Sequence, residues 1–459
     1  MLKVTIQGLG YVGSATAIAL ASRLNKNKKP IFKVTGVDLN NNLGVKKINE
    51  INKGRFPFKT NDKSIPFFLK KIKKNKNLQA TFQKNSYKSS SIVIMSINFD
   101  LSLENRKFSG ELKKLKNSFL DIVKNISENT LILIETTLPP GTTEKILFPI
   151  MKSTLKKRKL NIKKVYLAHS YERVTPGKNY INSIINYWRV FGGVNKESSL
   201  MCKKFLNKFV NVKKFPLTQL NNATCSELSK ILENTFRATN IALIDEWSQY
   251  AEKLNIDLFE IIKAIKIRPT HSNILNPGLG VGGYCLTKDP LFGEVSAKKI
   301  FKFKKNSFEF SKKTILTNKK MPLRSVNKIL EISNGRLKSK KILLLGATYK
   351  EDVADTRHSP SEIFYKNVKK KGAIIEVHDP LLKFWDEVNS KVLNTLPNFK
   401  NYDILFFAVK NNIYKKIDFN LNKLKKNVII FDSNNVLTNK QILKIKKQKI
   451  KIFSIGRGR

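Results

Sequence analysis

The N-terminal region contains the pattern that most constrains the fold of this chain. An apolar run at residues 3–7 leads into Gly8-Leu9-Gly10-Tyr11-Val12-Gly13, an Ala-rich helical stretch follows, and a second apolar run, residues 31–37, ends on Asp38. A strand, a G-x-G-x-x-G turn, a helix, a strand and an acid in this order are typical of dinucleotide-binding domains. The glycines permit the tight turn, and a pyrophosphate is held where the helix N-terminus presents unpaired N–H groups. We therefore expect a Rossmann-type domain at the start of the chain.

Asp38 indicates which dinucleotide is bound. A carboxylate at the end of the second strand accepts hydrogen bonds from a ribose 2′-hydroxyl and repels a 2′-phosphate, so we expect NAD rather than NADP. The interval before Asp38 is longer than usual and fits a lengthened helix–strand loop at residues 25–30. The expected cofactor residues in this region are Gly8, Gly10, Tyr11, Val12, Gly13 and Asp38.

Polar residues follow two later strands at their C-terminal ends. Compact apolar runs at residues 92–97 and 131–136 are typical of buried strands, and the second leads into Glu135-Thr136-Thr137-Leu138-Pro139-Pro140-Gly141. A further strand at residues 165–169 leads into Ser170-Tyr171-Glu172-Arg173-Val174. Open α/β sheets bind ligands at such strand ends. Thr137 and Glu172 are therefore candidate site residues, and Thr137 is also a candidate cofactor contact.

A long helix is expected from residue 224 to about residue 254. Thr224 and Glu227 have the spacing of a capping box, and the apolar positions that follow have a helical period. Lys230 and Asn234 are four residues apart and share a face of this helix. Two long donors side by side suggest an oxyanion site, although an ordinary solvated helix face has the same pattern.

A cysteine lies in a glycine-rich stretch, Asn276-Pro277-Gly278-Leu279-Gly280-Val281-Gly282-Gly283-Tyr284-Cys285-Leu286-Thr287-Lys288-Asp289-Pro290. Glycine lacks a Cβ, so this backbone can let a substrate approach closely. A thiol near a cation ionises more readily and becomes a nucleophile, although most unpaired cysteines are small buried hydrophobes. The three cysteines, Cys202, Cys225 and Cys285, have unrelated spacings, which argues against a disulfide framework. The four histidines are scattered without metal-ligand spacing, so no metal is expected.

The αβ alternation restarts after a Lys- and Phe-rich connector at residues 298–320. Strands are expected at residues 340–346, 373–377, 403–409 and 428–432. This pattern predicts a second doubly wound domain, which implies a second nucleotide-like ligand. The whole chain is therefore expected to have an α/β fold with two doubly wound, Rossmann-like domains joined by a central segment that contains a long helix.

The composition is strongly basic. Lys and Arg number 87 against 34 Asp and Glu, which gives a formal net charge of +53. Such a charge suits nucleic acid or an anionic membrane, but the lysines are spread along the chain and form no recognisable nucleic-acid module. Residue bias explains the excess better, so we expect neither a specific nucleic-acid partner nor a membrane partner. Without a signal peptide or a long apolar run, the protein is expected to be soluble and cytoplasmic.

These motifs together resemble the nucleotide-sugar 6-dehydrogenase family, which includes the UDP-glucose and UDP-N-acetylhexosamine dehydrogenases. The resemblance covers nearly the whole chain in one order, and it is carried by Gly8-x-Gly10-x-x-Gly13, Glu135-Thr136-Thr137-x-Pro139-Pro140-Gly141, Glu172-Arg173-Val174, Lys230-x-x-x-Asn234, Gly282-Gly283-Tyr284-Cys285-x-x-Lys288-Asp289 and Thr348-Tyr349-Lys350 through Thr356-Arg357-x-Ser359-Pro360. It implies an NAD-binding domain at residues 1–215, a central helical dimerisation and catalytic-cysteine segment at 216–318, and a nucleotide-sugar-binding domain at 319–459. It also implies a homodimer.

The resemblance further implies a reaction. The family oxidises the C6 primary alcohol of a sugar nucleotide to a carboxylate, using two NAD in succession. Cys285 would attack the intermediate aldehyde, and Lys230 and Asn234 would stabilise the oxyanion formed at each tetrahedral stage. Asp289 would orient or deprotonate a water, assisted by Thr137 and Glu172. The residues that would bind the UDP-sugar are Glu172, Lys230, Asn234, Gly282, Gly283, Lys350 and Arg357.

Three segments depart from the family pattern. Ser96-Ile97-Asn98-Phe99-Asp100 replaces a usual Thr-Pro pair, His169-Ser170-Tyr171 replaces a proline-bearing approach to Glu172, and Thr175-Pro176 stands where some relatives have a second glutamate. The approach to Cys285 and the terminal Ile455-Gly456-Arg457-Gly458 resemble the N-acetylhexosamine branch, whereas Tyr284-Cys285-Leu286 resembles the glucose branch. We favour a UDP-N-acetylhexosamine substrate, with UDP-glucose as the alternative.

Two further readings of the sequence are possible. A two-electron dehydrogenase of a small hydroxy acid also combines a Rossmann domain with long helices, but it leaves the second α/β domain and Cys285 without roles. A basic protein that binds an anionic polymer on an inactive dehydrogenase fold would explain the charge. The number of NADH molecules formed per sugar separates these readings, because only the first reading requires two.

Overall fold

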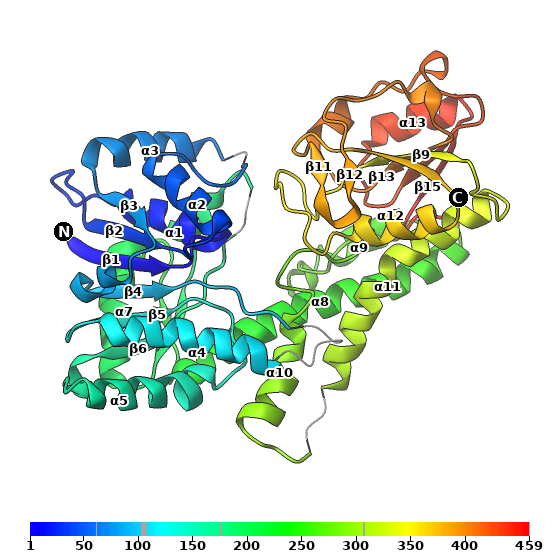
Figure 1. The fold of residues 1–459 in the computed structure, drawn as a ribbon. Coiled ribbons are helices and arrows are strands. Elements are labelled where there is room, and N and C mark those ends of the chain that lie inside the picture. Colours follow the sequence, from blue (N-terminus) through cyan, green and yellow to red (C-terminus); the bar gives the residue numbers. More distant parts are fainter. Residues whose placement is uncertain (61, 102–107, 175–176, 306–307, 459) are drawn as a thin grey trace. The chain divides into compact units, whose positions relative to one another are not determined.

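The computed structural model describes residues 1–459 apart from residues 61, 102–107, 175–176, 306–307 and 459 (Figure 1). The chain forms two compact units. Unit 1 contains residues 1–233 and 291–308, and unit 2 contains residues 234–290 and 309–459. The helix α8 (Ala223–Lys253) contributes residues to both units. The α/β class with two doubly wound domains is confirmed, and the three domain boundaries expected from the sequence stay a prediction.

Unit 1 is built on an eight-stranded sheet with the order β3-β2-β1-β4-β5-β6-β7-β8. The first six strands in that order pair in parallel, and β7 runs antiparallel to β6. All four residues of β4 and of β5 are buried, as expected for central strands covered on both faces. The strands are β1 (Leu2–Gln7), β2 (Phe32–Val37), β3 (Leu78–Thr81), β4 (Ile92–Met95), β5 (Leu131–Ile134), β6 (Tyr166–His169), β7 (Val190–Gly193) and β8 (Thr218–Gln219).

The helices of unit 1 complete a doubly wound core. α1 follows β1 directly, and its many alanines are fully buried, so that the helix lies close to the sheet. α1 and its neighbours α3, α6 and α7 contribute to one large core cluster with strand residues. The helices are α1 (Tyr11–Ala21), α2 (Asn42–Asn52), α3 (Ser64–Asn75), α4 (Phe108–Asn125), α5 (Phe148–Lys157), α6 (Tyr180–Ile185), α7 (Lys196–Phe209) and α10 (Phe292–Val295).

Unit 2 contains a five-stranded parallel sheet with the order β10-β9-β13-β14-β15, so the strand order reverses between β9 and β13. Ligands bind at such a reversal point, outside the carboxyl ends of the two strands. The strands are β9 (Lys341–Leu345), β10 (Ile374–His378), β13 (Ile404–Phe407), β14 (Ile429–Asp432) and β15 (Lys451–Ser454), and β11 (Phe384–Trp385) pairs with β12 (Ser390–Lys391). The remaining helices are α9 (Leu258–Ile265), α11 (Glu309–Ile332), α12 (Pro360–Lys370) and α13 (Asn439–Lys447).

The long helix α11 corrects one expectation from the sequence. The Lys- and Phe-rich segment 298–320 is not only a connector, because α11 begins at Glu309 and continues past Pro322. The helix packs against α8, where Thr239 Oγ1 and Thr314 Oγ1 lie 3.0 Å apart. Arg324 of α11 also donates to Asp245 of α8 over 2.9 Å. Tertiary packing between two long helices therefore outweighs the low helical signal of the segment.

The C-terminal end of the chain packs against the turn between α8 and α9. The N–H of Leu258 donates to the carbonyl of Gly456, and the N–H of Gly458 donates to the carbonyl of Ile256, both over 2.9 Å. A Cβ added to Gly456 would lie 2.5 Å from the Pro277 ring, at the base of the glycine-rich cysteine stretch. The last residues of unit 2 therefore support the segment that leads to Cys285.

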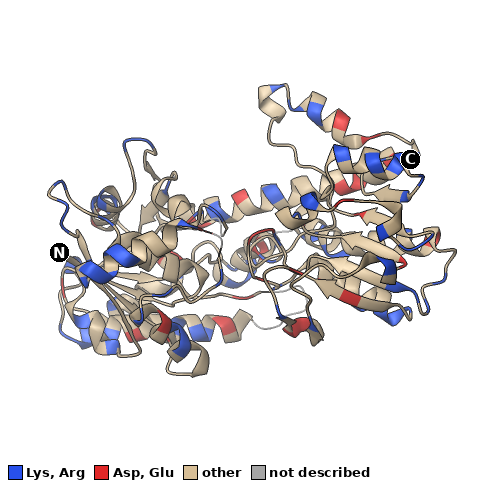
Figure 2. Ribbon diagram, turned by 90° about the horizontal axis from the view of Figure 1, so that it is seen from above, with Lys and Arg blue, Asp and Glu red and all other residues tan. Residues whose placement is uncertain are grey.

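Basic residues are found on helices and loops of both units (Figure 2). They include four lysines in α3 and four in α13. Among the residues that the structure describes, no helix is long and apolar enough to cross a membrane. Within the same residues, no group of His, Cys, Asp and Glu is arranged to hold a metal ion.

Candidate active site

The three glycines of the turn after β1 differ in the space around them. Only the Cβ position of Gly10 is open, and those of Gly8 and Gly13 are occupied by backbone atoms. A Cβ on Gly8 would lie 2.4 Å from the Ser96 carbonyl oxygen, and one on Gly13 would lie 1.9 Å from the Gly8 carbonyl oxygen. These two glycines let β1, β4 and α1 pack closely. A Cβ on Gly10, the residue before α1, would meet no atom within 4 Å. No protein atom fills the space beside Gly10 at the start of α1, which fits the pyrophosphate of a dinucleotide at the helix N-terminus.

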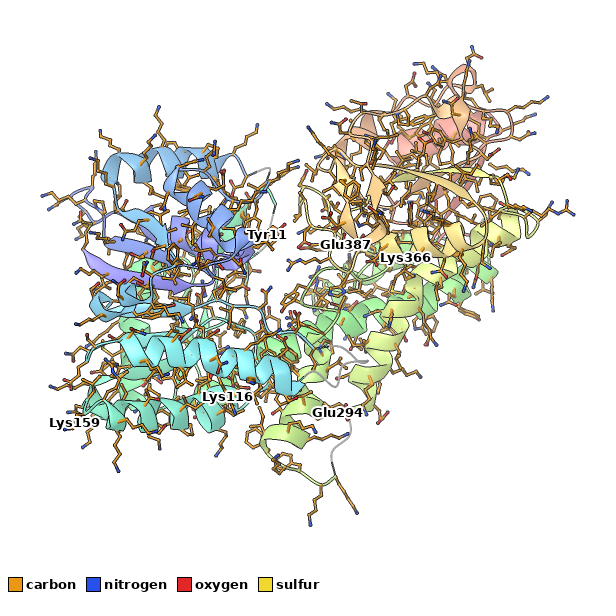
Figure 3. The ribbon with its side chains drawn as sticks, viewed as in Figure 1. Tyr11, Lys116, Lys159, Glu294, Lys366 and Glu387 are labelled. Atoms are coloured by element: carbon orange, nitrogen blue, oxygen red, sulfur yellow. The ribbon has the colours of Figure 1, made fainter. Side chains whose placement is uncertain are left out.

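Two aromatic residues and an acid frame this turn. Tyr11, labelled in Figure 3, is the first residue of α1, and its ring stacks on Phe58 with centroids 4.1 Å apart. Asp38, directly after β2, accepts a hydrogen bond from the N–H of Leu9 over 2.9 Å, so it lies beside the glycine turn. Lys47 of α2 also donates to the Asp38 carboxylate over 2.6 Å. The sequence reasoning missed Lys47, because no spacing rule connects it to the motif.

The loop after β5 carries Thr137 and is held from two sides. Thr136 Oγ1 accepts from the N–H of Ile97 over 3.1 Å, which ties the loop to the end of β4. Ser296 Oγ donates to the Pro140 carbonyl over 2.6 Å. The half-buried Thr137 therefore lies on a fixed loop at the carboxyl edge of the sheet.

Glu227 also holds this loop, and its role differs from the one that we expected. The helix α8 begins at Ala223, and the side chain of Asn222 accepts from the N–H of Cys225 over 2.8 Å. The capping box of Thr224 and Glu227 is therefore wrong. Glu227 instead accepts hydrogen bonds from Gly141 N–H (2.6 Å), Thr143 N–H (2.9 Å) and Thr143 Oγ1 (2.6 Å). Burial raises the pKa of Glu227 to about 8, and the three donors oppose that rise.

Lys230 lies beside the segment that follows β6. Its ammonium donates to the main-chain carbonyl of Glu172 over 3.0 Å and lies 5.2 Å from the centre of the Tyr171 ring. The Tyr171 hydroxyl lies 3.0 Å from Ser229 Oγ and donates to Glu233 over 3.2 Å. The Glu172 carboxylate accepts from the N–H of Val174. The structure therefore brings Lys230 and Glu172 together through the backbone of Glu172.

A buried polar cluster underlies these residues. Arg189 donates to Glu135 over 3.0 Å, and both side chains are almost completely buried. Burial raises the pKa of Glu135 above its ordinary value, and the Arg189 guanidinium offsets part of that rise. His169, the last residue of β6, lies with its Nδ1 2.9 Å from Ser226 Oγ, and burial lowers the pKa of His169 to about 3. The ends of β5 and β6 are therefore anchored by a neutral imidazole and an ion pair.

Unit 2 contributes a second group of expected residues. Asn234 of α8 donates its amide to Asp289 over 2.6 Å, and Lys288 donates to the other oxygen of Asp289 over 2.7 Å. Asp289 is fully buried, and Lys288 and Asn234 are buried as well. Cys285 is exposed, and its carbonyl accepts from the N–H groups of Lys288 and Asp289 over 3.1 and 3.0 Å. The turn therefore fixes Asp289 relative to the cysteine backbone.

The glycines before Cys285 allow close packing within unit 2. A Cβ on Gly282 would lie 2.7 Å from Tyr349 Cβ and 2.9 Å from the His358 carbonyl oxygen. A Cβ on Gly283, which has φ +81°, would lie 2.8 Å from the Tyr349 ring. The N–H of Gly283 donates to the Arg357 carbonyl over 3.2 Å. The cysteine turn is therefore fitted against the loop that follows β9.

That loop carries the two basic residues expected to bind substrate. Arg357 forms a two-point ion pair with Asp355, at 2.9 and 2.7 Å, and lies 5.3 Å from the centre of the Tyr284 ring. Lys350 is half-buried, and its main-chain carbonyl accepts a hydrogen bond from Thr348 Oγ1 over 3.0 Å. Glu387, labelled in Figure 3, accepts from Thr356 Oγ1 over 2.9 Å and so holds the same loop.

The expected site residues thus form two groups. Thr137, Glu172 and Lys230 lie in unit 1 with the glycine turn and Asp38, and Asn234, Cys285, Asp289, Lys350 and Arg357 lie in unit 2. Lys230 and Asn234 are one helical turn apart on α8. Thr175 and Pro176 lie outside the described residues.

Comparisons with known proteins cover the same regions. Models described as the NAD binding domain, the central domain and the UDP binding domain of the UDP-glucose/GDP-mannose dehydrogenase family match residues 2–210, 224–314 and 343–439. The chain is 31% and 32% identical to UDP-N-acetyl-D-mannosamine dehydrogenases of Methanococcus vannielii and Methanocaldococcus jannaschii, over 99% and 100% of its length and 97% of each relative. The solved UDP-D-ManNAc dehydrogenase of Pyrococcus horikoshii is similar over 99% of both chains, with a TM-score of 0.81 at 26% identity.

Proposed function

The chain belongs to the UDP-glucose/GDP-mannose dehydrogenase family, and on that basis we propose that it oxidises the C6 primary alcohol of a UDP-N-acetylhexosamine to a carboxylate with NAD. One observation supports the proposal most strongly. An exposed cysteine is followed, within four residues, by a buried carboxylate that two donors hold in place. A thiol nucleophile next to an oriented acceptor for water suits an oxidation that passes through an enzyme-bound thioester.

The cofactor supplies hydride acceptance when it is bound, and two equivalents are consumed for each sugar. The glycine turn and the N-terminus of α1 would hold its pyrophosphate, and Asp38, which lies beside that turn, would accept from a ribose hydroxyl. Lys47 beside Asp38 helps to set the orientation of that carboxylate. The half-buried Thr137, on the loop after β5, would contact the cofactor and the reacting groups.

The side chains act in three stages. The C6 alcohol first loses a hydride and a proton, and the Cys285 thiolate then adds to the aldehyde carbon to give a thiohemiacetal. Loss of a second hydride and the hydroxyl proton gives the thioester. Water then loses its protons as it attacks the thioester carbonyl, the C–S bond breaks, the cysteine leaves as a thiolate, and the sugar carbon becomes a carboxylate. Lys230 and Asn234 donate to the oxyanion of each tetrahedral stage.

Asp289 is the group that orients or deprotonates the hydrolytic water. Its carboxylate is buried and fixed by Asn234 and Lys288, so its free lone pairs have a defined direction. Glu172, whose carbonyl accepts from Lys230, assists through the water network. Lys350 and Arg357, together with Gly282 and Gly283, bind the sugar nucleotide at the loop after β9, where the strand order of the second sheet reverses.

The sugar is proposed from the relatives. Two relatives named UDP-N-acetyl-D-mannosamine dehydrogenase align with the chain over almost its entire length. This favours an N-acetylated hexosamine over glucose, in agreement with the terminal Ile455-Gly456-Arg457-Gly458 sequence. A cytoplasmic location fits a supply of NAD and UDP-sugar.

A homodimer is part of the same proposal. Four apolar residues of α8, Phe236, Leu243, Trp247 and Tyr250, are each 50–56% exposed. At about 100° per residue they fall on one face of the helix. An exposed apolar stripe of this length suits a second copy of the chain, because isologous contacts pair the same surface on both partners.

To test the proposal, the enzyme is incubated with NAD and each of a panel of UDP- and GDP-sugars, and the NADH formed per sugar consumed is measured. We expect two NADH per UDP-N-acetylhexosamine and no net acid formation by Cys285→Ser. A ratio of one NADH, or serine-variant turnover close to that of the native enzyme, would contradict the covalent proposal. Light scattering of Trp247→Glu tests the dimer, which we expect to dissociate into monomers.

A further inference from the structure

Glu227 is a buried carboxylate to which the proposed reaction gives no role. Its side chain is 0% exposed, yet it lies on α8 within one turn of Lys230. It accepts three hydrogen bonds, two from Thr143 and one from Gly141, and these residues are 84 and 86 positions away in the sequence. A buried carboxyl group with this many hydrogen-bond partners is costly to disturb, because each lost partner leaves a desolvated polar group behind.

The donors belong to the loop that carries Thr137. That loop leaves β5 at Ile134 and turns at Gly141, whose φ is +90°, into the π-helical turn Thr142–Leu147. A Cβ on Gly141 would lie 2.6 Å from the Phe301 ring, so the loop has no space to move on that side. On its other side the loop is hydrogen-bonded to Glu227 of α8. These bonds fix the distance between the loop and α8.

A second acid strengthens the same junction. Glu144, in the π-helical turn, accepts from the N–H of Thr224 over 3.3 Å and from its hydroxyl. Glu227 therefore reaches from α8 to the loop, and Glu144 reaches from the turn back to α8. Ser226 ties the same part of α8 to His169 at the end of β6. The first two turns of α8 are thus fixed to the carboxyl ends of two strands.

We propose that Glu227 is a positioning residue that keeps Thr137 and Lys230 in one geometry by fixing the loop after β5 against α8. The inference rests on the proposed function, because it assigns Thr137 and Lys230 to the reacting centre. All of the contacts that carry it lie within unit 1. Displacement of a reacting group by about 1 Å costs on the order of 100-fold in rate, so a loosened junction lowers kcat more than substrate binding.

Glu227→Gln tests the junction. The amide keeps the shape, but its NH2 group faces donors and cannot accept from them. We expect kcat to fall on the order of 10- to 100-fold with little change in KM, while the yield stays at two NADH per sugar. Glu227→Asp, which keeps both acceptor oxygens on a shorter side chain, recovers part of the loss. Glu197→Gln is the matched control, because Glu197 is an exposed acid in the first turn of α7 in the same unit.

A double-mutant cycle separates positioning from general destabilisation. If Glu227 acts through Thr137, Glu227→Gln has almost no further effect on kcat in a Thr137→Ala background. An equal fold-loss in both backgrounds, or an unchanged kcat in the single variant, overturns the inference and leaves the proposed function intact. If Glu227→Gln does not fold, Thr143→Val removes one of the three hydrogen bonds and provides the same cycle. Loss of the two-to-one NADH yield in the native enzyme would instead contradict the proposed function.

Discussion

The two units use glycine for different purposes at their ligand ends. In unit 1, the Cβ position of Gly10 is open and faces no atom within 4 Å, whereas that of Gly13 is blocked by backbone. In unit 2, the Cβ positions of Gly280, Gly282 and Gly283 are all filled by neighbouring side chains. A glycine-rich stretch therefore signals either a surface left free for a ligand or a backbone packed against its own domain. Only the three-dimensional surroundings of each glycine distinguish the two.

The largest loss of activity is expected when a methyl group is added to Gly282 in unit 2. Gly282→Ala places a Cβ 2.7 Å from Tyr349 Cβ, so the turn with Cys285 must shift. We expect kcat to fall by about 100-fold, because a displaced nucleophile loses its alignment. NADH affinity, measured by fluorescence titration, should stay unchanged. Gly110→Ala is the control, since a Cβ there meets no atom within 4 Å. A native kcat in Gly282→Ala would remove the contrast between the units.

A smaller effect concerns a feature that both units share, a buried histidine at the end of a strand. Burial lowers the pKa of His169 to about 3 and that of His378 to about 4. The unfolded chain therefore binds a proton from about pH 6.5 downward that the folded chain does not, and each histidine costs about 2 kcal/mol of stability by pH 5. The stability continues to fall with pH until the pH passes below the pKa of the histidine in the folded chain.

Urea midpoints at pH 7 and pH 5 measure this loss. We expect His169→Asn and His378→Asn each to flatten the acid dependence to a similar degree. Below about pH 4 only His169 continues to contribute, so the two variants should then diverge. Variants that keep the native slope would show that neither imidazole is held neutral by burial.

The smallest expected effect comes from the open glycine of unit 1. Gly10→Ala adds a methyl group where no protein atom lies within 4 Å, so the thermal midpoint should stay at the native value. The methyl occupies space where a pyrophosphate approaches, and we expect NADH affinity to fall by about tenfold. Calorimetric titration with NADH measures this change. An unchanged affinity would mean that the open position does not face the dinucleotide.

The sequence predicts the fold well where a strand is apolar throughout. β4, β5 and β13 consist of apolar residues and are buried along their length, so the runs at residues 92–97, 131–136 and 403–409 mark them clearly. The short β8 has two exposed polar residues, and β15 begins with a lysine and follows a lysine-rich helix, so neither gives a periodic signal. The sequence also did not predict α11. Its many lysines and Pro322 are typical of a linker, and its packing partner α8 is distant in the sequence.

The site shows the same limit. Lys230, Asn234, Cys285 and Asp289 can be found from motifs, whereas the hydrogen bond between Asn234 and Asp289 was not expected, because the motifs assign these two residues different roles. Glu227 was assigned to a capping box because its spacing from Thr224 fits that local rule. Its partners Gly141 and Thr143 are far away in sequence, and no local pattern identifies such a contact.

The packing of the C-terminal residues has a practical consequence for handling the protein. Gly456 and Gly458 fit without side chains against Pro277 and Asn255, respectively. An affinity tag or fusion partner attached at that end would follow Gly458 and would compete for its contacts with the turn between α8 and α9. Met1 is 71% exposed ahead of β1, so purification handles and surface-tethering groups are better placed at the amino end.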